Sequence, residues 1–241
     1  MSLEALLQQG AVWRGGESAL RPRPTAGSGL PTGYAPLDEA LPGAGWPLGA
    51  LTEILHADAG IGELQLVIPA LARLTAAGRR VLWIDPPFIP YAPALELAGV
   101  SLYYTHIVRP DKPEDALWAL EQGLRSGSCA AVLAWPRHPE LAQLRRLQLA
   151  AEAGDCVAFL FRPAAVASQS SPAALRLRLT PEARALKLDV IKCRGRFFTA
   201  PIRCPLPATQ RSAATADPSA AHARFDSINP RRASTPPPHG A

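Results

Sequence analysis

The residues with the clearest potential for chemistry form a short loop, Ala57-Asp-Ala-Gly-Ile-Gly-Glu-Leu64. The loop follows a strand-like run over 51–55 and leads into a helical pattern. In a parallel sheet covered by helices, this is where backbone N–H groups bind phosphate, with the pattern G-x-x-x-x-G-K-S/T. Ala57 stands at the first Gly and Gly62 at the second. Glu63 replaces the Lys, and Leu64 replaces the Ser/Thr.

These substitutions remove the chemistry of a nucleotide site. The Lys of the pattern supplies a cation to the phosphates, and the hydroxyl binds magnesium. Glu63 reverses the sign of that charge and Asp58 adds a second negative charge, so a polyphosphate is repelled instead of attracted. We therefore predict that the loop binds no nucleotide, that the protein has no ATPase activity and that it carries no cofactor.

The other reactive side chains do not form a catalytic set. The five His and four Cys residues lack metal-ligand spacing, and no Ser/His/Asp or Cys/His arrangement is evident. Asp85 ends an apolar run, but two prolines follow it and no carboxylate is near to activate water, so a strand-end cap is the favoured interpretation. We predict no catalytic residue and no metal site, and hence a protein that is not an enzyme.

Positive charge gathers towards the end of the folded part. Residues 172–204 carry eight basic and two acidic side chains, within a chain of net charge +5. Lys192, Arg194 and Arg196 alternate there, and if the strand persists to Arg196 all three side chains point to one face. Such a face suits an acidic protein surface or DNA phosphate, while a solvated strand face remains the alternative. Direct DNA binding is left open at this point.

The hydrophobic pattern alternates between short apolar runs and helical spacing. This alternation predicts a mostly parallel sheet with helices on both faces, which is an α/β fold. After residue 174 the pattern changes to period two, which predicts antiparallel edge strands on the same sheet. The predicted strands are 51–55, 81–85, 105–108, 130–135 and 156–161, the helices 63–77, 91–98, 114–125 and 139–153, and the edge strands 175–179, 186–192 and 197–203.

The chain divides into three predicted parts. Residues 1–30 form an arm and linker, residues 31–204 the core, and residues 205–241 a disordered tail of Pro, Ala, Ser and Arg. No run approaches the length of a membrane span, and the first residues lack the basic start of a secretory signal. The composition therefore predicts a cytoplasmic protein without membrane contact.

In this order of elements the chain resembles the RecA-like ATPase core. Thr32-Gly-Tyr34 through Gly45-Trp-Pro-Leu-Gly49 is similar to the segment that leads into the RecA phosphate loop. Pro87 falls where RecA carries its catalytic Glu, and Trp135 falls at its magnesium-binding Asp. The resemblance thus implies a RecA-like core in which each placed ATPase residue is substituted.

Two families share such a degenerate core. Val12-Trp-Arg-Gly15, Leu30-Pro-Thr-Gly33 and Phe161-Arg-Pro163 resemble ImuA, the SOS mutagenesis accessory protein. SulA, the SOS-induced inhibitor of the division protein FtsZ, shares the helix end Gly123–Gly127 and Phe161-Arg-Pro163. SulA-like chains end soon after that point, whereas this chain continues with strands over 175–203, which favours ImuA.

The ImuA resemblance implies a non-catalytic accessory role in error-prone translesion DNA synthesis. Its partners would be an ImuB-like polymerase homologue, a DnaE-type polymerase and RecA. Trp13 and Arg14 resemble the RecA arm that reaches a neighbouring protomer, so they are candidate partner contacts and self-association is left open. Lys192, Arg194 and Arg196 are the other candidates. The alternative is a SulA-like division inhibitor that binds FtsZ.

Overall fold

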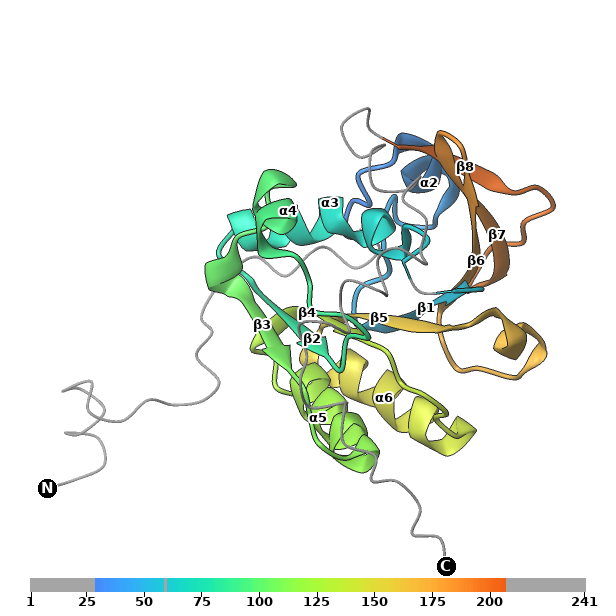
Figure 1. The fold of residues 1–241 in the computed structure, drawn as a ribbon. Coiled ribbons are helices and arrows are strands. Elements are labelled where there is room, and N and C mark those ends of the chain that lie inside the picture. Colours follow the sequence, from blue (N-terminus) through green and yellow to red (C-terminus); the bar gives the residue numbers. More distant parts are fainter. Residues whose placement is uncertain (1–28, 59, 207–241) are drawn as a thin grey trace, which may run out of the picture.

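The polypeptide builds an eight-stranded sheet with helices packed on both of its faces (Figure 1). This computed structural model describes residues 29–58 and 60–206. The strand order is β3-β2-β4-β5-β1-β6-β7-β8. The strands are β1 (Ala50–His56), β2 (Arg80–Ile84), β3 (Thr105–Val108), β4 (Cys129–Ala134), β5 (Val157–Pro163), β6 (Leu175–Glu182), β7 (Ala185–Cys193) and β8 (Ile202–Pro205).

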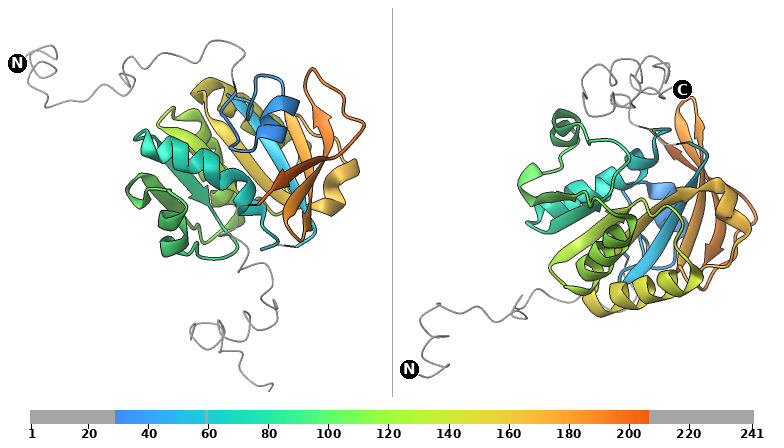
Figure 2. Two further views of the ribbon diagram at one scale, coloured as in Figure 1. Left: turned by 90° about the horizontal axis from the view of Figure 1, so that it is seen from above. Right: turned by 60° about the horizontal axis from the view of Figure 1, so that its bottom comes forward.

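The helices lie in two layers, with α3 and α4 above the sheet in Figure 1 and α5 and α6 below it. The right-hand view of Figure 2 shows α5 and α6 side by side on the sheet face that is lower in Figure 1. Because both faces are covered, the central strands are apolar on both sides. The helices are α2 (Ala35–Ala40), α3 (Glu63–Ala76), α4 (Ala92–Leu97), α5 (Pro113–Arg125) and α6 (Leu141–Gly154), with 3-10 turns η1 (Leu102–Tyr104) and η2 (Ala164–Ser168).

The hydrophobic core is split in two by the sheet. On the α3 side, Trp46 packs edge-on against Phe159 with ring centroids 5.2 Å apart, and Leu66 and Leu71 of α3 are fully buried. On the other side, Leu120 of α5 packs with the α6 residues in a second cluster. The predicted alternation of buried strands and amphipathic helices up to residue 163 is therefore confirmed.

The prediction of three antiparallel edge strands is wrong for the first of them. β6 pairs with β1 in parallel register, with Thr52 opposite Leu175, and the antiparallel pairs are β6 with β7 and β7 with β8. The reason is the connection between β5 and β6. The chain returns through η2 before β6 begins, so β6 runs in the same direction as β1. Period-two spacing shows a half-covered strand but not its direction.

The last predicted strand is shorter than the pattern suggested. β7 ends at Cys193, Gly195 turns the chain with a φ of 84°, and β8 begins only at Ile202. Glycine accepts this left-handed conformation at little cost. Pro201, directly before β8, has no N–H to donate to a ladder.

Most of the predicted N-terminal arm (1–30) and of the predicted disordered tail (205–241) lies outside the described part of the chain, which leaves out residues 1–28 and 207–241. The inner ends of both belong to the fold, because Leu30 is buried and bridges Trp46, and Pro205 is the last residue of β8. Among residues 29–58 and 60–206, none of the helices combines the length and the apolar character that crossing a membrane requires.

Candidate partner-binding surface

The loop at the carboxyl end of β1 contains an anion of its own. The Glu63 side chain turns back so that its two carboxylate oxygens accept the Gly60 N–H, at 2.9 and 3.0 Å. Only 4% of Glu63 is exposed, although it is ionisable. Gly60 and Gly62 have φ values of 86° and 103°, which the loop needs to bring this N–H to the carboxylate.

The remaining residues of the loop have no phosphate-binding function in this geometry. Ala57 is exposed, and Leu64 is partly buried against the core on the α3 side. His56 is 8% exposed, and its Nδ1 lies 2.9 Å from the Asp58 carbonyl oxygen. The His56 Nε2 is buried without a hydrogen-bond partner among the described residues.

Aromatic rings fill the carboxyl edge of the sheet next to this loop. Phe161 stacks on Trp135 with centroids 4.6 Å apart, and Trp135 stacks on Trp83 at 5.9 Å. His56 lies 6.4 Å from Phe161 at the β1 end of the row. In this row, Trp135 occupies the position compared above with a magnesium-binding Asp, so the edge offers packing surface there and no carboxylate.

A buried ion cluster lies on the other face of β1 and was not predicted from the sequence. Glu53, with no exposed surface, accepts hydrogen bonds from Arg162 Nη1 at 2.9 Å, Arg176 Nε at 2.7 Å and Ser171 Oγ at 2.8 Å. Each guanidinium belongs to a neighbouring strand, β5 or β6. The cluster therefore joins three strands through one carboxylate.

The same cluster fixes the η2 connection. Arg176 donates further hydrogen bonds to the carbonyls of Val166, Ala167 and Gln169, at 2.8–3.1 Å. Lys192 Nζ donates to the Ser171 carbonyl at 2.7 Å. Burial, followed by the positive charges of Arg176 and Arg194, lowers the pKa of Lys192. A Glu in the middle of the apolar run 50–56 was the one sequence signal for this cluster.

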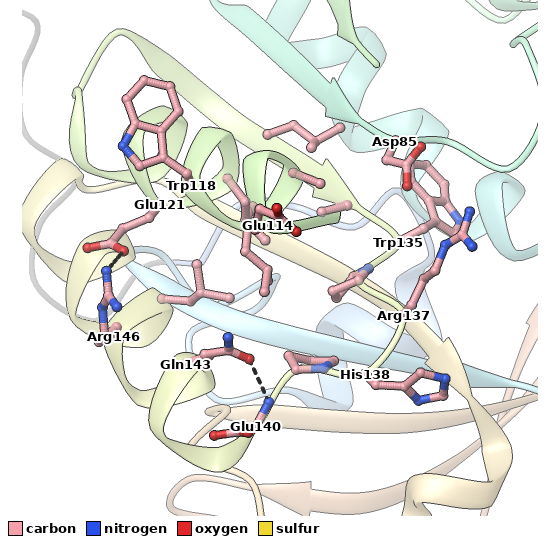
Figure 3. Close-up of a pocket in the computed structure, with 18 residues that line it drawn as sticks. Asp85, Glu114, Trp118, Glu121, Trp135, Arg137, His138, Glu140, Gln143 and Arg146 are labelled. Carbon is pink, nitrogen blue, oxygen red and sulfur yellow. Dashed lines mark hydrogen bonds and ion pairs between the residues drawn. The ribbon is translucent and has the colours of Figure 1, made fainter. Parts of the chain in front are cut away.

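A groove of about 580 Å³ lies between α5 and α6, at the carboxyl ends of β2 and β4 (Figure 3). One end is closed by Glu121, which pairs with Arg146 of α6 and with Arg125. Asp85 and Arg137 lie at the other end. Apolar residues form most of the floor, namely Ile84, Leu117, Leu120, Ala134 and Leu147.

This groove lies where the direction of the chain connections reverses. From β2 the chain continues outward to β3, and from β4 it continues the other way to β5. Open α/β sheets bind ligands at such points. An apolar floor between charged ends suits the side chains of a partner, and the lining also includes the ionisable side chains of Asp85, Glu114 and His138.

The predicted basic face does not form as one face. Lys192 is on β7 and reaches Ser171, whereas Arg196 lies beyond the turn and its Nη1 donates to the Ala40 carbonyl at 2.7 Å. Arg194 is exposed and lies in the turn itself. The strand ends at Cys193, so the alternation of side chains stops before Arg194. The three cations are exposed, and their role as partner contacts stays a prediction.

The other two candidate contacts, Trp13 and Arg14, lie outside the described residues. Exposed hydrophobic side chains mark a surface that the sequence did not single out. Most of them belong to the β2–β3 connection, β3 and the outer side of α5. Those more than a third exposed in the described residues are Phe88, Ile89, Tyr91, Leu97, Tyr103, Ile107, Val108, Trp118, Leu141, Leu149 and Phe197.

The central part of the chain is similar to known proteins. Residues 49–158 match the family model of the cell division inhibitor SulA. Residues 49–158 are SulA-like. SulA of Edwardsiella piscicida is 35% identical over 101 residues, which are 42% of this chain and 60% of that protein. SulA of Serratia marcescens is 29% identical over 117 residues, 48% of this chain and 68% of that protein.

A solved structure of SulA from Pseudomonas aeruginosa is 23% identical, with a TM-score of 0.40, and covers 46% of this chain and 97% of the SulA chain. Among the curated relatives, the match spans only 60% of the length of the Edwardsiella protein. The matching family and these relatives are named as cell division inhibitors.

The match corrects the predicted function. The role in translesion synthesis is wrong, and so are the predicted partners ImuB, the DnaE-type polymerase and RecA, because the matching family and relatives are division inhibitors. Phe161-Arg-Pro163 resembled both families in the sequence and so did not separate them. The choice of ImuA depended on the strands after residue 174, which lie outside the matched region and do not determine what that region binds.

Proposed function

We propose that this protein is an SOS-induced inhibitor of cell division that acts by binding FtsZ, the alternative that the sequence left open. The observation that carries the proposal is the match of residues 49–158 to the SulA family model. The proposal places the protein in the cytoplasm, as the sequence indicated.

The geometry supports a binding function in place of a nucleotide-driven one. The loop after β1 already has a buried carboxylate on its Gly60 N–H, at the place where a nucleotide phosphate would need that donor. We include in the proposal that residues 31–204 form a RecA-like core without nucleotide chemistry. Residues 1–30 and 205–241 then flank this core.

The distribution of exposed hydrophobic residues supports binding through the SulA-like region. Of the eleven side chains named above, ten lie within residues 49–158, and only Phe197 lies outside. Large apolar patches on a soluble domain mark interaction surfaces. The connection between β2 and β3 contributes several of them, among them Ile89 (65% exposed) and Tyr91 (72%).

The test is expression of the full chain in a bacterium, together with a sedimentation assay of purified FtsZ from the same organism. We expect filamentous cells and, in the tube, fewer FtsZ polymers in the pellet. Ile89→Asp should abolish both effects, because an aspartate places a charge in the contact surface. Phe197→Asp is the matched control, since Phe197 is fully exposed but outside the SulA-like region.

Both variants change exposed side chains, so their melting temperatures should stay within a few degrees of the wild type. Normal division and unchanged FtsZ polymers in the presence of wild-type protein would refute the proposed function. An effect lost in Phe197→Asp but kept in Ile89→Asp would move the contact surface outside the SulA-like region.

A further inference from the structure

The two edges of the sheet are protected to different degrees. β8 carries Arg203 and Pro205 on its four residues, and charged side chains and prolines are the usual means of keeping an edge from pairing with another chain. β3, at the opposite edge, has neither in its sequence Thr105-His-Ile-Val108. Figure 1 shows β3 at the outer border of the sheet.

Towards the carboxyl end of β3, the backbone groups that no described strand pairs are those of Ile107. The Val108 carbonyl accepts the Asp85 N–H, so the groups of Val108 point towards β2. Along a strand, the N–H and C=O of one residue point to one side, and those of the next residue point to the other side. Ile107 directly precedes Val108 and stands opposite Trp83 in the parallel register. The N–H and C=O of Ile107 therefore face away from β2, and no described strand lies on that side.

Apolar side chains accompany this free edge. Ile107 is 44% exposed and Val108 is 38% exposed, on the last two residues of the strand. Tyr103, 81% exposed, precedes the strand on η1. An extended segment that pairs with β3 would thus bury apolar surface as well as satisfy the Ile107 backbone.

The charge around β3 distinguishes between occupants. The segments that adjoin β3 in sequence, 96–104 and 109–115, have four exposed acidic side chains and two basic ones, and one of the basic ones, Arg109, donates its Nη2 hydrogen to the Pro86 carbonyl. A second copy of this chain would bring the same acidic segments to the edge, which like-charge repulsion disfavours. The edge fits an extended segment with apolar side chains and basic residues.

We propose that β3 binds an extended, apolar and basic segment of the partner division protein by adding it as a further strand of the sheet. Main-chain hydrogen bonds to Ile107 give affinity in this mode, and the side chains beside them give specificity. This inference rests on the proposed function, because the partner, FtsZ, is the one named there.

The experiment measures binding of purified FtsZ to the full chain and to Ile107→Pro. Proline removes the outward N–H and leaves the ladder to β2 intact, a change that edge strands tolerate. We expect at least tenfold weaker binding with a melting temperature near that of the wild type. Ile107→Val keeps the N–H and should bind within about twofold, whereas His106→Pro removes a ladder bond and should lower the melting temperature.

Hydrogen exchange of the Ile107 amide in the wild-type chain gives a second measurement that needs no variant. FtsZ should slow this exchange at least tenfold. If wild-type protein does not bind FtsZ, the proposed function fails and the edge proposal with it. If it binds and Ile107→Pro binds equally well, only the edge proposal fails.

Two further outcomes would overturn the edge proposal. If the Ile107 amide is protected from exchange in the absence of FtsZ, and this protection disappears on dilution, a second copy of the chain occupies β3. Protection that disappears when residues 207–241 are removed would show that this segment of the chain occupies the edge.

Discussion

Replacing Glu53 by Gln is the most direct test of the physical account of this fold. The substitution keeps the size of the side chain and removes its charge. The Arg162 and Arg176 guanidinium groups, 3% and 5% exposed, then lie in the interior without a counter-ion. One oxygen of the carboxylate also becomes an NH2 group that points at existing donors.

The expected loss of stability is large. Removing one partner of a buried ion pair costs about 3–5 kcal/mol, because the remaining charge cannot return to water. A domain of this size melts about 2–4 °C lower for each kcal/mol, so the melting temperature should fall by about 6–20 °C. Glu121→Gln is the matched control. Its partners Arg125 and Arg146 are 55% and 66% exposed, and the expected loss is about 1 kcal/mol or less.

The assay is thermal and urea unfolding of wild type and both variants, followed by circular dichroism at neutral pH. Limited proteolysis should in addition show earlier cleavage near Gln169 in Glu53→Gln, since the Arg176 guanidinium that donates to the Gln169 carbonyl is also held by the Glu53 carboxylate. Equal shifts in the two Glu→Gln variants would refute the claim that the buried cluster contributes more than an exposed ion pair.

Two more predictions concern ligand binding and pH. Magnesium-ATP should not raise the melting temperature of the wild-type chain, because Glu63 occupies the Gly60 N–H; a clear rise would show that the loop binds nucleotide after all. Burial raises the pKa of Cys204 from 9.0 to about 12 and that of Tyr34 from 10.0 to about 12. The unfolded chain therefore loses these protons at lower pH than the folded chain, so the free energy of unfolding should fall between about pH 9 and 12. Urea unfolding under reducing conditions should show a shallower fall in Cys204→Ala.

Local pattern was sufficient for the central elements of the fold. The spacing of Leu64, Val67, Ile68 and Leu71 predicted α3, because a helix buried on one side has apolar residues at helical spacing. The apolar run before Trp135 predicted β4, because a strand covered on both faces is apolar throughout. The direction of β6 left no such trace. It depends on how the chain crosses from β5, a property of the connection and not of the strand.

The candidate site was less predictable for a related reason. Glu53 is 109 residues from Arg162 and 123 from Arg176 in sequence, and no local rule joins charges so far apart. Three cations near Gly195 formed a regular pattern, yet the turn at that glycine separated them. The exposed edge β3 contains only Ile, Val, His and Thr, which in a sequence are indistinguishable from a buried strand.

The carboxylate that lies on the Gly60 N–H has a consequence for how such a protein is controlled. A phosphate-binding loop that takes up and releases a nucleotide can switch its protein between two states. Here the acceptor on the Gly60 N–H is a side chain of the same polypeptide, so this contact does not depend on the concentration of a ligand. Under the proposed function, the extent of inhibition would follow the amount of protein in the cell and not a nucleotide cycle at this loop.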